Sequence, residues 1–507
     1  MKSFKLIAYS LLFCLLLSCN SNDHKIDFTF LQVNDVYEIA PIQGGKYGGM
    51  ARLEALHQEL VKENTNTFLF IAGDFLNPSL LGTIKYNGEH VQGKQMVEIM
   101  NAMNFELAAF GNHEFDLSQK DLQKRLNEST FHWIGSNVTL NLNGTTQPFY
   151  KEKEEIKMPI PKTYIKEIGD EDGTKIKIGF ISVCIPSNPK SYVSYSDMFE
   201  AAKSSYEMIK DNVDIVFGLT HVKIEHDKKI AELIPEIPLI MGGHEHTHMR
   251  HRVGNTIITK ADANAKTAYV HKISFDKKTK KITIASELKE INTSIIPEKK
   301  IATIVNKWQD ILNVKVKEII ANPDETIYRS KVPLEGRDTP IRSEQTNLGK
   351  LVARSMAFAY NDAVDCAIVN SGSIRIDDTL EGAVTGIDIF RVLPYGGAIL
   401  KIEIKGSLLQ EVLEFGAAAK GRGAYLQRYR AEKKNTYWTI SGKQLDSDKI
   451  YTVAISDYLI KGFDIPVLNE KNKDITTIYR PAKNELEYDI RKAMVHYLKV
   501  QYKESQE

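Results

Sequence analysis

Residues 67–74, TFLFIAGD, form an apolar run that ends in a glycine and an aspartate. Four more apolar runs before residue 250 end in residues able to bind a metal ion. They are DFTFLQVND to Asp35, ELAAFGNHEFD around Asn112, DIVFGLTH to His221, and IPLIMGGHEH to His244 and His246. In an open α/β sheet, ligands bind outside the carboxyl ends of the strands. Asp, Asn and His suit hard or borderline divalent cations, so these ends together predict a site for more than one metal ion.

Strand-like and helical patterns alternate through residues 26–295, which we assign to one domain. Residues 50–63, MARLEALHQELVKE, carry apolar side chains at helical spacing, whereas residues 175–183, KIKIGFISV, are typical of a strand. Such alternation indicates an α/β layered domain. Residues 130–175 interrupt the alternation, and we expect them to form a surface excursion such as a hairpin.

The chain has 507 residues, which exceeds the size at which one hydrophobic core keeps growing, so we expect at least two domains. Residues 301–313, IATIVNKWQDILN, place apolar side chains on one helical face, and we assign 296–324 to a linker helix. Residues 314–320, VKVKEII, are typical of a strand. Residues 325–507 are assigned to a second domain of mixed α/β structure.

The N-terminus resembles the export signal of a bacterial lipoprotein. A basic start and an apolar stretch too short to span a bilayer comfortably precede Leu16-Leu17-Ser18-Cys19, which is similar to a lipobox. We therefore expect residues 1–18 to be removed, Cys19 to carry lipid, and residues 19–25 to tether the protein to the periplasmic side or the cell surface. The alternative is an uncleaved N-terminal anchor. Cys184 and Cys366 fall in different expected domains, so we expect two buried free thiols.

The bulk composition excludes one class of partner. The formal net charge is +1, and 26% of residues are charged. A balance so near neutral gives no electrostatic reason to expect a nucleic-acid polymer as a partner. We expect a small-molecule substrate instead.

The residues around the metal-ligand candidates indicate phosphoester chemistry. Asp74 can bridge two ions held about 3.5–4 Å apart, as in two-metal hydrolases. His113 directly follows Asn112, and Asp116 three residues later can fix the tautomer of its ring. We interpret His113 as a general acid or as a stabiliser of the leaving oxygen; the alternative is a histidine with only a structural partner.

The motifs ND, GD, GNHEFD, LTH and GHEH, in this order, resemble those of the calcineurin-like metallophosphoesterases. With the motifs of the second domain, the chain resembles the 5′-nucleotidase family. The resemblance implies a four-layer β-sandwich with flanking helices and two divalent ions (Zn, Mn, Co or Fe). It implies Asp35, Asp74 and His246 at one ion, and Asp74, Asn112, His221 and His244 at the other. It also implies that His113, Asp116 and Asn112 take part in catalysis.

Tyr37 stands where this family has a histidine, because the first motif is Asp35-Val36-Tyr37. A phenol is a poor ligand for a divalent ion at neutral pH, since its unperturbed pKa is about 10. Three interpretations follow. Tyr37 is a spectator; it binds as tyrosinate, which favours Fe(III); or the site is degenerate and inactive.

The second domain matches the positions with which the family contacts its substrate. The resemblance implies that Arg342, Asn370 and Arg375 contact phosphate and ribose, that Tyr395 and Tyr458 enclose the base, and that Asp464 contacts the nucleoside. The alternatives are solvated arginines and packed core tyrosines. Two motifs depart from the family: NSGSIR at residues 370–375 replaces NGGGIR, and GFDI at residues 462–465 replaces GGDG.

We therefore expect hydrolysis of nucleoside 5′-phosphates to nucleoside and phosphate. The departures leave two alternatives open. One is a related hydrolase of nucleotide sugars, cyclic nucleotides or other small phosphoesters. The other is a catalytically weakened nucleotide-binding lipoprotein. Because metal and base positions lie in different domains, we also expect domain closure during turnover.

Overall fold

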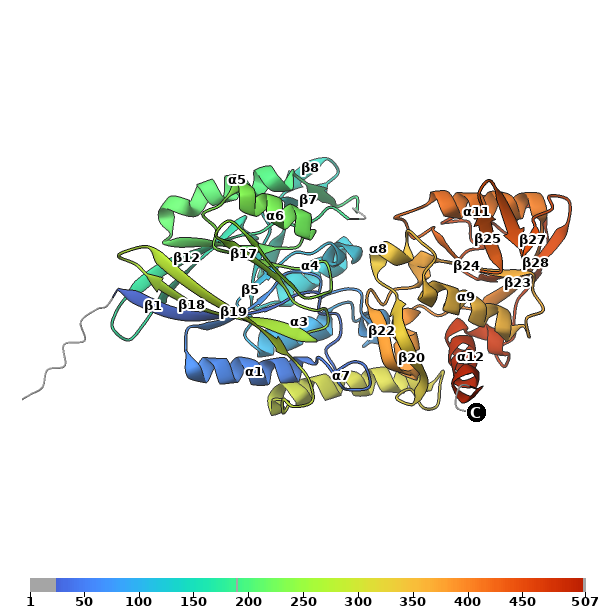
Figure 1. Cartoon of the computed structure of the whole chain (residues 1–507), viewed down its shortest axis with the longest axis horizontal. Coiled ribbons are helices and arrows are strands. Elements are labelled where there is room, and N and C mark those ends of the chain that lie inside the picture. Colours follow the sequence, from blue (N-terminus) through green and yellow to red (C-terminus); the bar gives the residue numbers. More distant parts are fainter. Residues whose placement is uncertain (1–23, 188–189, 505–507) are drawn as a thin grey trace, which may run out of the picture.

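The computed structural model describes residues 24–187 and 190–504. The expected signal peptide and the lipidation of Cys19 lie outside the described residues. Within the described ranges, no helix combines the length and the apolar character needed to cross a bilayer. Two lobes lie side by side, the first coloured blue to green and the second orange to red (Figure 1).

The first lobe contains two six-stranded sheets. The first sheet has the order β19-β18-β1-β2-β5-β6, in which β1, β2, β5 and β6 run parallel, while β18 pairs antiparallel with both of its neighbours, β1 and β19. Its strands are β1 (Lys25–Val33), β2 (Thr67–Ile71), β5 (Leu107–Ala109), β6 (His132–Ile134), β18 (Thr267–Asp276) and β19 (Lys281–Glu290).

The second sheet has the order β11-β12-β14-β15-β17-β16, with β12, β14, β15 and β17 parallel. Its strands are β11 (Thr163–Gly169), β12 (Lys175–Ile181), β14 (Ile215–Thr220), β15 (Leu239–Gly242), β16 (Met249–Val253) and β17 (Thr256–Lys260). Between the two sheets lies an aromatic core that includes Phe30, Phe70, Phe180 and Phe217.

Helices cover the outer face of each sheet, and the expected four-layer sandwich is confirmed. The first sheet packs against α1 (Met50–Glu63), α3 (Lys94–Ala102) and α4 (Gln119–Glu128), and α7 (Lys299–Lys317) packs on α1 and α3. The second packs against α5 (Met198–Ile209) and α6 (Ile224–Leu233). Both thiols, Cys184 and Cys366, are buried and free as expected.

Short strands occupy the segment that interrupts the alternation. The expected hairpin is β9 (Tyr150–Lys153) with β10 (Ile156–Pro159). A small sheet of order β13-β7-β8 comprises β7 (Val138–Leu142), β8 (Thr145–Gln147) and β13 (Val193–Tyr195). The short elements α2 (Leu80–Thr83), β3 (Lys85–Tyr86) and β4 (Glu89–His90) lie between β2 and α3.

The linker helix α7 lies within the assigned residues 296–324 but continues past residues 301–313, whose pattern is helical. Residues 314–320 were expected to form a strand, which is wrong, because residues 314–317 are the last turn of α7. The buried residues Trp308, Leu312 and Val316 recur every four positions, so the helical face continues to Val316. Figure 1 shows α7 running along the lower edge of the first lobe towards β20 and β22.

The second lobe is a five-stranded mixed sheet of order β24-β21-β28-β23-β29. Its strands are β21 (Cys366–Asn370), β23 (Ile399–Lys405), β24 (Leu426–Tyr429), β28 (Ile450–Ser456) and β29 (Ile475–Tyr479). One core contains α9 (Asn347–Ala359), α10 (Gly386–Val392) and α12 (Ile490–Glu504), and another contains α11 (Gly406–Ala418).

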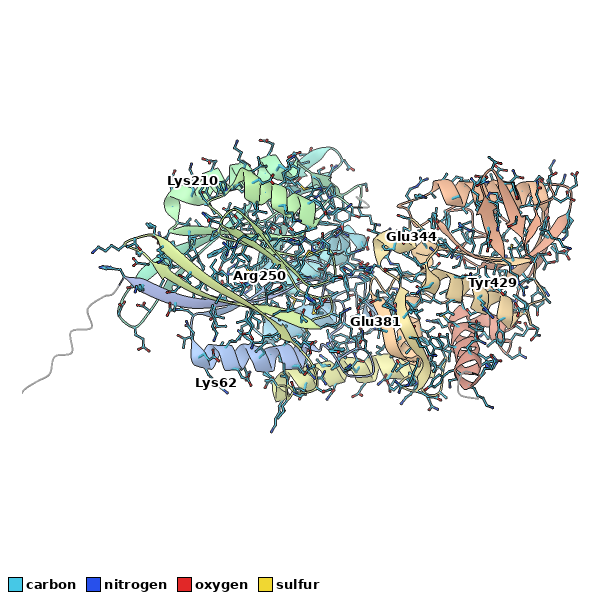
Figure 2. All side chains as sticks on the ribbon, viewed as in Figure 1. Lys62, Lys210, Arg250, Glu344, Glu381 and Tyr429 are labelled. Carbon is cyan, nitrogen blue, oxygen red and sulfur yellow. The ribbon has the colours of Figure 1, made fainter. Side chains whose placement is uncertain are left out.

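A ribbon and a short helix join the lobes. The ribbon pairs β20 (Thr326–Glu335) with β22 (Thr379–Thr385), and α8 (Asp338–Ile341) follows β20. A small sheet of β25 (Ala431–Lys434), β26 (Tyr437–Ile440) and β27 (Lys443–Gln444) lies at the outer end of the second lobe. Charged side chains of both signs project into solvent over both lobes, for example Lys62, Lys210 and Glu381 (Figure 2). The limits of the two domains stay predictions.

Candidate metal and catalytic centre

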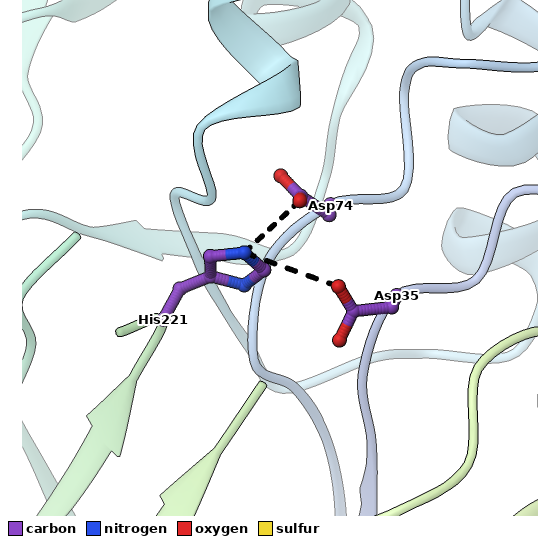
Figure 3. Close-up of side chains that lie close together, drawn as sticks. All are labelled: Asp35, Asp74 and His221. Carbon is purple, nitrogen blue, oxygen red and sulfur yellow. Dashed lines mark ion pairs between the residues drawn. The ribbon is translucent and has the colours of Figure 1, made fainter. Parts of the chain in front are cut away.

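The carboxyl ends of β1, β2 and β14 bring Asp35, Asp74 and His221 together, as Figure 3 shows. Nε2 of His221 lies 2.9 Å from Oδ2 of Asp74 and 3.9 Å from Oδ1 of Asp35. Nε2 of His246, which follows β15, lies 3.1 Å from the same Asp35 oxygen. The ring of His244 lies 5.4 Å from that of His221.

Oδ1 of Asn112 is buried and finds no hydrogen-bond partner within the described ranges. Oδ2 of Asp74 and Nε2 of His221, also buried, face each other at 2.9 Å and find no other partner there. Burial of a polar atom without a partner costs free energy, so such atoms call for another ligand. Nδ1 of His221 donates to the carbonyl of Ala72 at 2.7 Å, which leaves Nε2 as the electron-pair donor. Carboxylate, amide oxygen and imidazole nitrogen form a set that fits divalent ions.

Four of the predicted ligands have a left-handed backbone. The φ angles are 53° at Asp35, 55° at Asp74, 91° at His244 and 60° at His246. Asp and His adopt this region more readily than most residues, yet each instance carries a cost. The surrounding fold therefore holds these side chains in place against local strain.

Glu114, which the sequence analysis did not single out, braces the loop that carries Asp74. Its carboxylate accepts hydrogen bonds from the backbone N–H groups of Asp74, Phe75, Leu76 and Gly111 at 2.7–3.1 Å. Burial, and then the nearby Asp74, raise the pKa of Glu114 to about 7. Glu114 lies between His113 and Asp116, so GNHEFD supplies the brace as well as the predicted catalytic groups.

Lys260, also missed, braces the loop that carries His244 and His246. Its fully buried ammonium donates to the carbonyls of Val222 and Gly243 at 2.5 and 2.8 Å and pairs with Asp227 at 2.8 Å. It also contacts the carboxylate of Glu245. A charged residue in the central strand β17 was the available signal, because lysine is almost never fully buried without a partner.

The predicted pair of His113 and Asp116 forms, with Nδ1 of His113 at 2.7 Å from Oδ2 of Asp116. The same oxygen accepts from Arg375 at 2.8 Å and from Asn77 at 3.1 Å. Burial opposes a charged ring, but Asp74 and Asp116 raise the pKa of His113 well above its usual value. Burial likewise opposes ionisation of Asp116, yet His113 and Arg375 hold its pKa far below the usual range.

Tyr37 is buried at the same centre. Its hydroxyl lies 3.0 Å from Nε2 of His246, 3.4 Å from Oδ1 of Asp35 and 3.3 Å from Oδ2 of Asp377. Burial, and then the carboxylates around it, raise the pKa of Tyr37 well above its usual value. Asp377, from the second lobe, is a residue that the sequence analysis missed. The contact spans 340 positions of the chain.

A cavity of about 350 Å³ opens beside the centre, lined from the first lobe by Asp74, Asn112, His113, His244 and His246. The second lobe contributes Arg337, Asp338, Thr339, Pro340 and Asp377. Arg342 does not line this cavity but pairs with Asp338 at 2.6 Å. Arg375 and Tyr395 line a neighbouring, smaller cavity.

Three of the residues predicted to contact the substrate, Asn370, Tyr458 and Asp464, lie together in the second lobe. Asn370 donates to Asp464 at 2.8 Å, and the hydroxyl of Tyr458 lies 3.3 Å from Asp464. Tyr395 precedes β23 and Tyr458 follows β28. These two strand ends lie side by side because the strands pair antiparallel. Phe463, the second residue of GFDI, lies 6.2 Å from Tyr458 between ring centroids.

Comparison with known families covers both lobes. Residues 28–248 match the calcineurin-like phosphoesterase family, and residues 326–470 match the 5′-nucleotidase C-terminal domain. The chain belongs to the 5′-nucleotidase family. It is a metal-dependent hydrolase of phosphoesters.

Curated relatives agree with this membership. The human 5′-nucleotidase is 26% identical over 419 residues, which cover 75% of this chain and 68% of the relative. The trifunctional nucleotide phosphoesterase YfkN of Bacillus subtilis is 27% identical over 445 residues, 79% of this chain and 28% of that protein.

A solved structure also shares the fold of this 5′-nucleotidase family member. A 5′-nucleotidase precursor from Thermus thermophilus has a TM-score of 0.65 and 22% identity, covering 94% of this chain and 97% of that one. The roles of individual residues in metal binding, catalysis and substrate contact stay predictions.

Proposed function

We propose that the protein hydrolyses nucleoside 5′-phosphates to nucleoside and phosphate at a centre of two divalent ions. The observation that carries the proposal is the convergence of the buried ligand atoms of Asp74, Asn112 and His221 beside the pair of His113 and Asp116. In the described ranges these ligand atoms have no hydrogen-bond partner outside their own group. Asp35 and His246 would hold one ion with Asp74. Asn112, His221 and His244 would hold the other with Asp74.

When bound, two divalent ions supply positive charge for a phosphoryl group and activate water for in-line attack. The residues of the chain supply the rest. His113 faces the cavity and would give a proton to the leaving oxygen, while Asp116 holds its Nδ1–H. Glu114 and Lys260 keep the two ligand loops in position.

Nucleoside recognition would fall to the exposed rings of the second lobe. Tyr395 is 66% exposed and Phe463 74% exposed, so flat apolar surface is available for a base to stack on. Stacking is worth about 1–3 kcal/mol per base and tolerates different bases. Asp464, fixed by Asn370, would accept hydrogen bonds from the nucleoside.

The test is phosphate release by the purified chain loaded in turn with Mn, Zn, Co or Fe. Substrates are nucleoside monophosphates, nucleotide sugars, cyclic nucleotides and sugar phosphates. We expect nucleoside 5′-phosphates to be hydrolysed best, and both Asp74→Asn and His113→Ala to lose activity. The matched control is His248→Ala, an exposed histidine paired with Asp262. Equal release by wild type and Asp74→Asn would contradict the proposal.

We also propose that the protein is exported and anchored to the bacterial membrane by lipid on Cys19. The support is the lipobox-like sequence that ends at Cys19. Cells that express the full chain should incorporate labelled fatty acid into it and keep it in the membrane fraction. The variant Cys19→Ser should lose the label. A wild-type chain without label would contradict this proposal.

A further inference from the structure

The carboxylate of Asp377 projects from the second lobe into the centre of the first. Its Oδ2 atom lies 3.2 Å from Nε2 of His113 and 3.3 Å from the hydroxyl of Tyr37. The same oxygen lies 3.5 Å from Nε2 of His246. The other oxygen, Oδ1, accepts a hydrogen bond from the backbone N–H of Asp338 at 2.7 Å. One carboxylate oxygen therefore faces two side chains that can donate protons.

The loop around Asp377 is fastened on both sides. Arg375 pairs with Asp116 at 2.8 Å, and Asp378 pairs with Lys266 at 3.0 Å. Asn264 donates to Asp378 at 3.1 Å. Asp377 itself has a φ of 45°, a left-handed backbone that is costly for a residue with a side chain. These contacts hold the Asp377 carboxylate in place beside His113.

The position of this oxygen is that expected for an oxygen of a substrate. It contacts His113, whose other ring nitrogen is held by Asp116, and it borders the predicted ligand His246. An anionic oxygen is stabilised where donors already point at it. A phosphoryl oxygen carries the same charge and acceptor character as a carboxylate oxygen. Asp377 thus shows where the site binds an anionic oxygen.

Tyr37 fits the role of donor better than that of metal ligand. A phenol keeps its proton at neutral pH, and a protonated phenol binds divalent ions poorly. Its single proton has acceptors in Asp35, His246 and Asp377. Ions bound by Asp35 and His246 would occupy those two acceptors. The proton of Tyr37 would then point to the oxygen in the position of Asp377.

We propose that Tyr37 and His113 form a two-donor pocket for the phosphoester oxygen that His113 would protonate, which Asp377 fills until phosphate displaces it. The inference rests on the proposed phosphoester chemistry and gives Tyr37 a role in it. The departure from the family at this position then exchanges a metal ligand for a hydrogen-bond donor. The cost is one fewer protein ligand at the first ion.

The test measures binding of inorganic phosphate by calorimetry and metal content by elemental analysis, both on the Mn²⁺-loaded full chain. Tyr37→Phe removes the hydroxyl and keeps the ring. Hydrogen bonds to charged groups contribute about 1.5–3 kcal/mol, so phosphate should bind roughly 10- to 100-fold more weakly. Asp377→Asn removes the competing charge, and phosphate should bind more tightly, by up to the same factor of roughly 10 to 100. Metal content should stay at the wild-type value in both.

Two matched controls separate local from general effects. Tyr360→Phe removes a buried hydroxyl in the second lobe, where it donates to the carbonyl of Ile399. Asp362→Asn removes one negative charge from the surface of the same lobe, where Asp362 pairs with Arg430. Neither should change the affinity for phosphate.

Three results would overturn the inference. Loss of one ion per chain in Tyr37→Phe would make Tyr37 a ligand, and the same loss in Asp377→Asn would make Asp377 one. Unchanged or weaker phosphate binding by Asp377→Asn would show that Asp377 does not compete. A chain that meets all expectations for phosphate but hydrolyses no nucleotide would refute the proposed substrate and leave the pocket standing.

Discussion

The metal-ligand edge of the first lobe and the aromatic cluster of the second differ in how tightly they are held. Asp35, Asp74 and His221 are almost fully buried, and Glu114 and Lys260 brace the loops around them. Tyr395, Tyr458 and Phe463 are exposed by 66, 37 and 74%. The groups proposed for bond cleavage are thus preorganised, whereas those proposed for base recognition stay open to solvent. Substitutions should therefore be costly at the edge and mild at the cluster.

The largest effect on turnover should come from His113→Ala. General acid–base groups contribute about 100- to 10,000-fold, and kcat should fall by that factor because the leaving oxygen loses its proton donor. Metal content should not change, since His113 is not a predicted ligand. Phosphate released at fixed times gives kcat, and elemental analysis of the same sample gives the metal content. A parallel loss of metal would mean that His113 holds the centre together.

The next largest effect should come from Lys260→Met, which removes the brace of the loop around His244. Loss of one partner from a buried ion pair costs about 3–5 kcal/mol, because Asp227 stays buried without its cation. Urea unfolding at pH 7 measures the loss. The control Lys272→Met breaks an exposed pair with Glu63 and should cost no more than about 1 kcal/mol. Equal losses of unfolding free energy in the two variants would show that the buried pair of Lys260 contributes no more to stability than an exposed pair.

The buried side chain of His271 should make the stability of the first lobe depend on pH. Burial lowers the pKa of His271 to about 3, and its ring lies 3.0 Å from Oε1 of Gln32 and 2.8 Å from Oγ of Ser286. Between pH 6.5 and 3 the unfolded chain binds a proton that the folded chain refuses, so stability falls as pH falls. The slope approaches about 1.4 kcal/mol per pH unit.

The variant His271→Gln has no such proton to bind. Its unfolding free energy, measured with urea from pH 7 to pH 5, should fall less steeply than that of the wild type by roughly this slope. Identical slopes in the two proteins would contradict the assignment of a neutral buried His271.

The smallest effects should come from the aromatic cluster. Tyr395→Ala or Phe463→Ala should raise KM for a nucleoside 5′-phosphate about 10-fold, in line with the loss of one stacking contact. Hydrolysis of a sugar phosphate without a base should be unaffected. Tyr437→Ala, an exposed tyrosine on β26, serves as control. Equal losses with both substrates would show that the rings act on the fold rather than on the base.

The convergence of these strand ends could be predicted from the sequence, because neighbouring residues mark both each strand and the polar residue that follows it. Apolar runs that stop at Asp35, Asp74 and His221 mark both the strand and its polar end, so topology alone brings the ends together. The extent of α7 was missed because Val314 and Val316 favour a strand locally. Packing of Val316 against the first lobe overrides that preference.

Long-range contacts could not be read in the same way. Asp377 meets Tyr37 across 340 positions, and no local pattern distinguishes it from Asp378. Lys260 stands in an apolar strand, where its charge was the one signal of a buried partner. Glu114 lies inside a recognised motif, yet its four backbone contacts appear only when the loop of Asp74 is folded.

The most direct test of the central claim is the number of metal ions bound per chain. The metal-stripped full chain is titrated with Mn²⁺ under calorimetry, and bound metal is counted by elemental analysis after dialysis. Two ions per wild-type chain are expected. The site at which Tyr37 stands in place of a histidine should bind its ion more weakly. Asp74→Asn should weaken the binding of both ions, because Asp74 belongs to both proposed ligand sets. One ion per wild-type chain, or an Asp74→Asn chain that still binds two with wild-type affinity, would contradict the account.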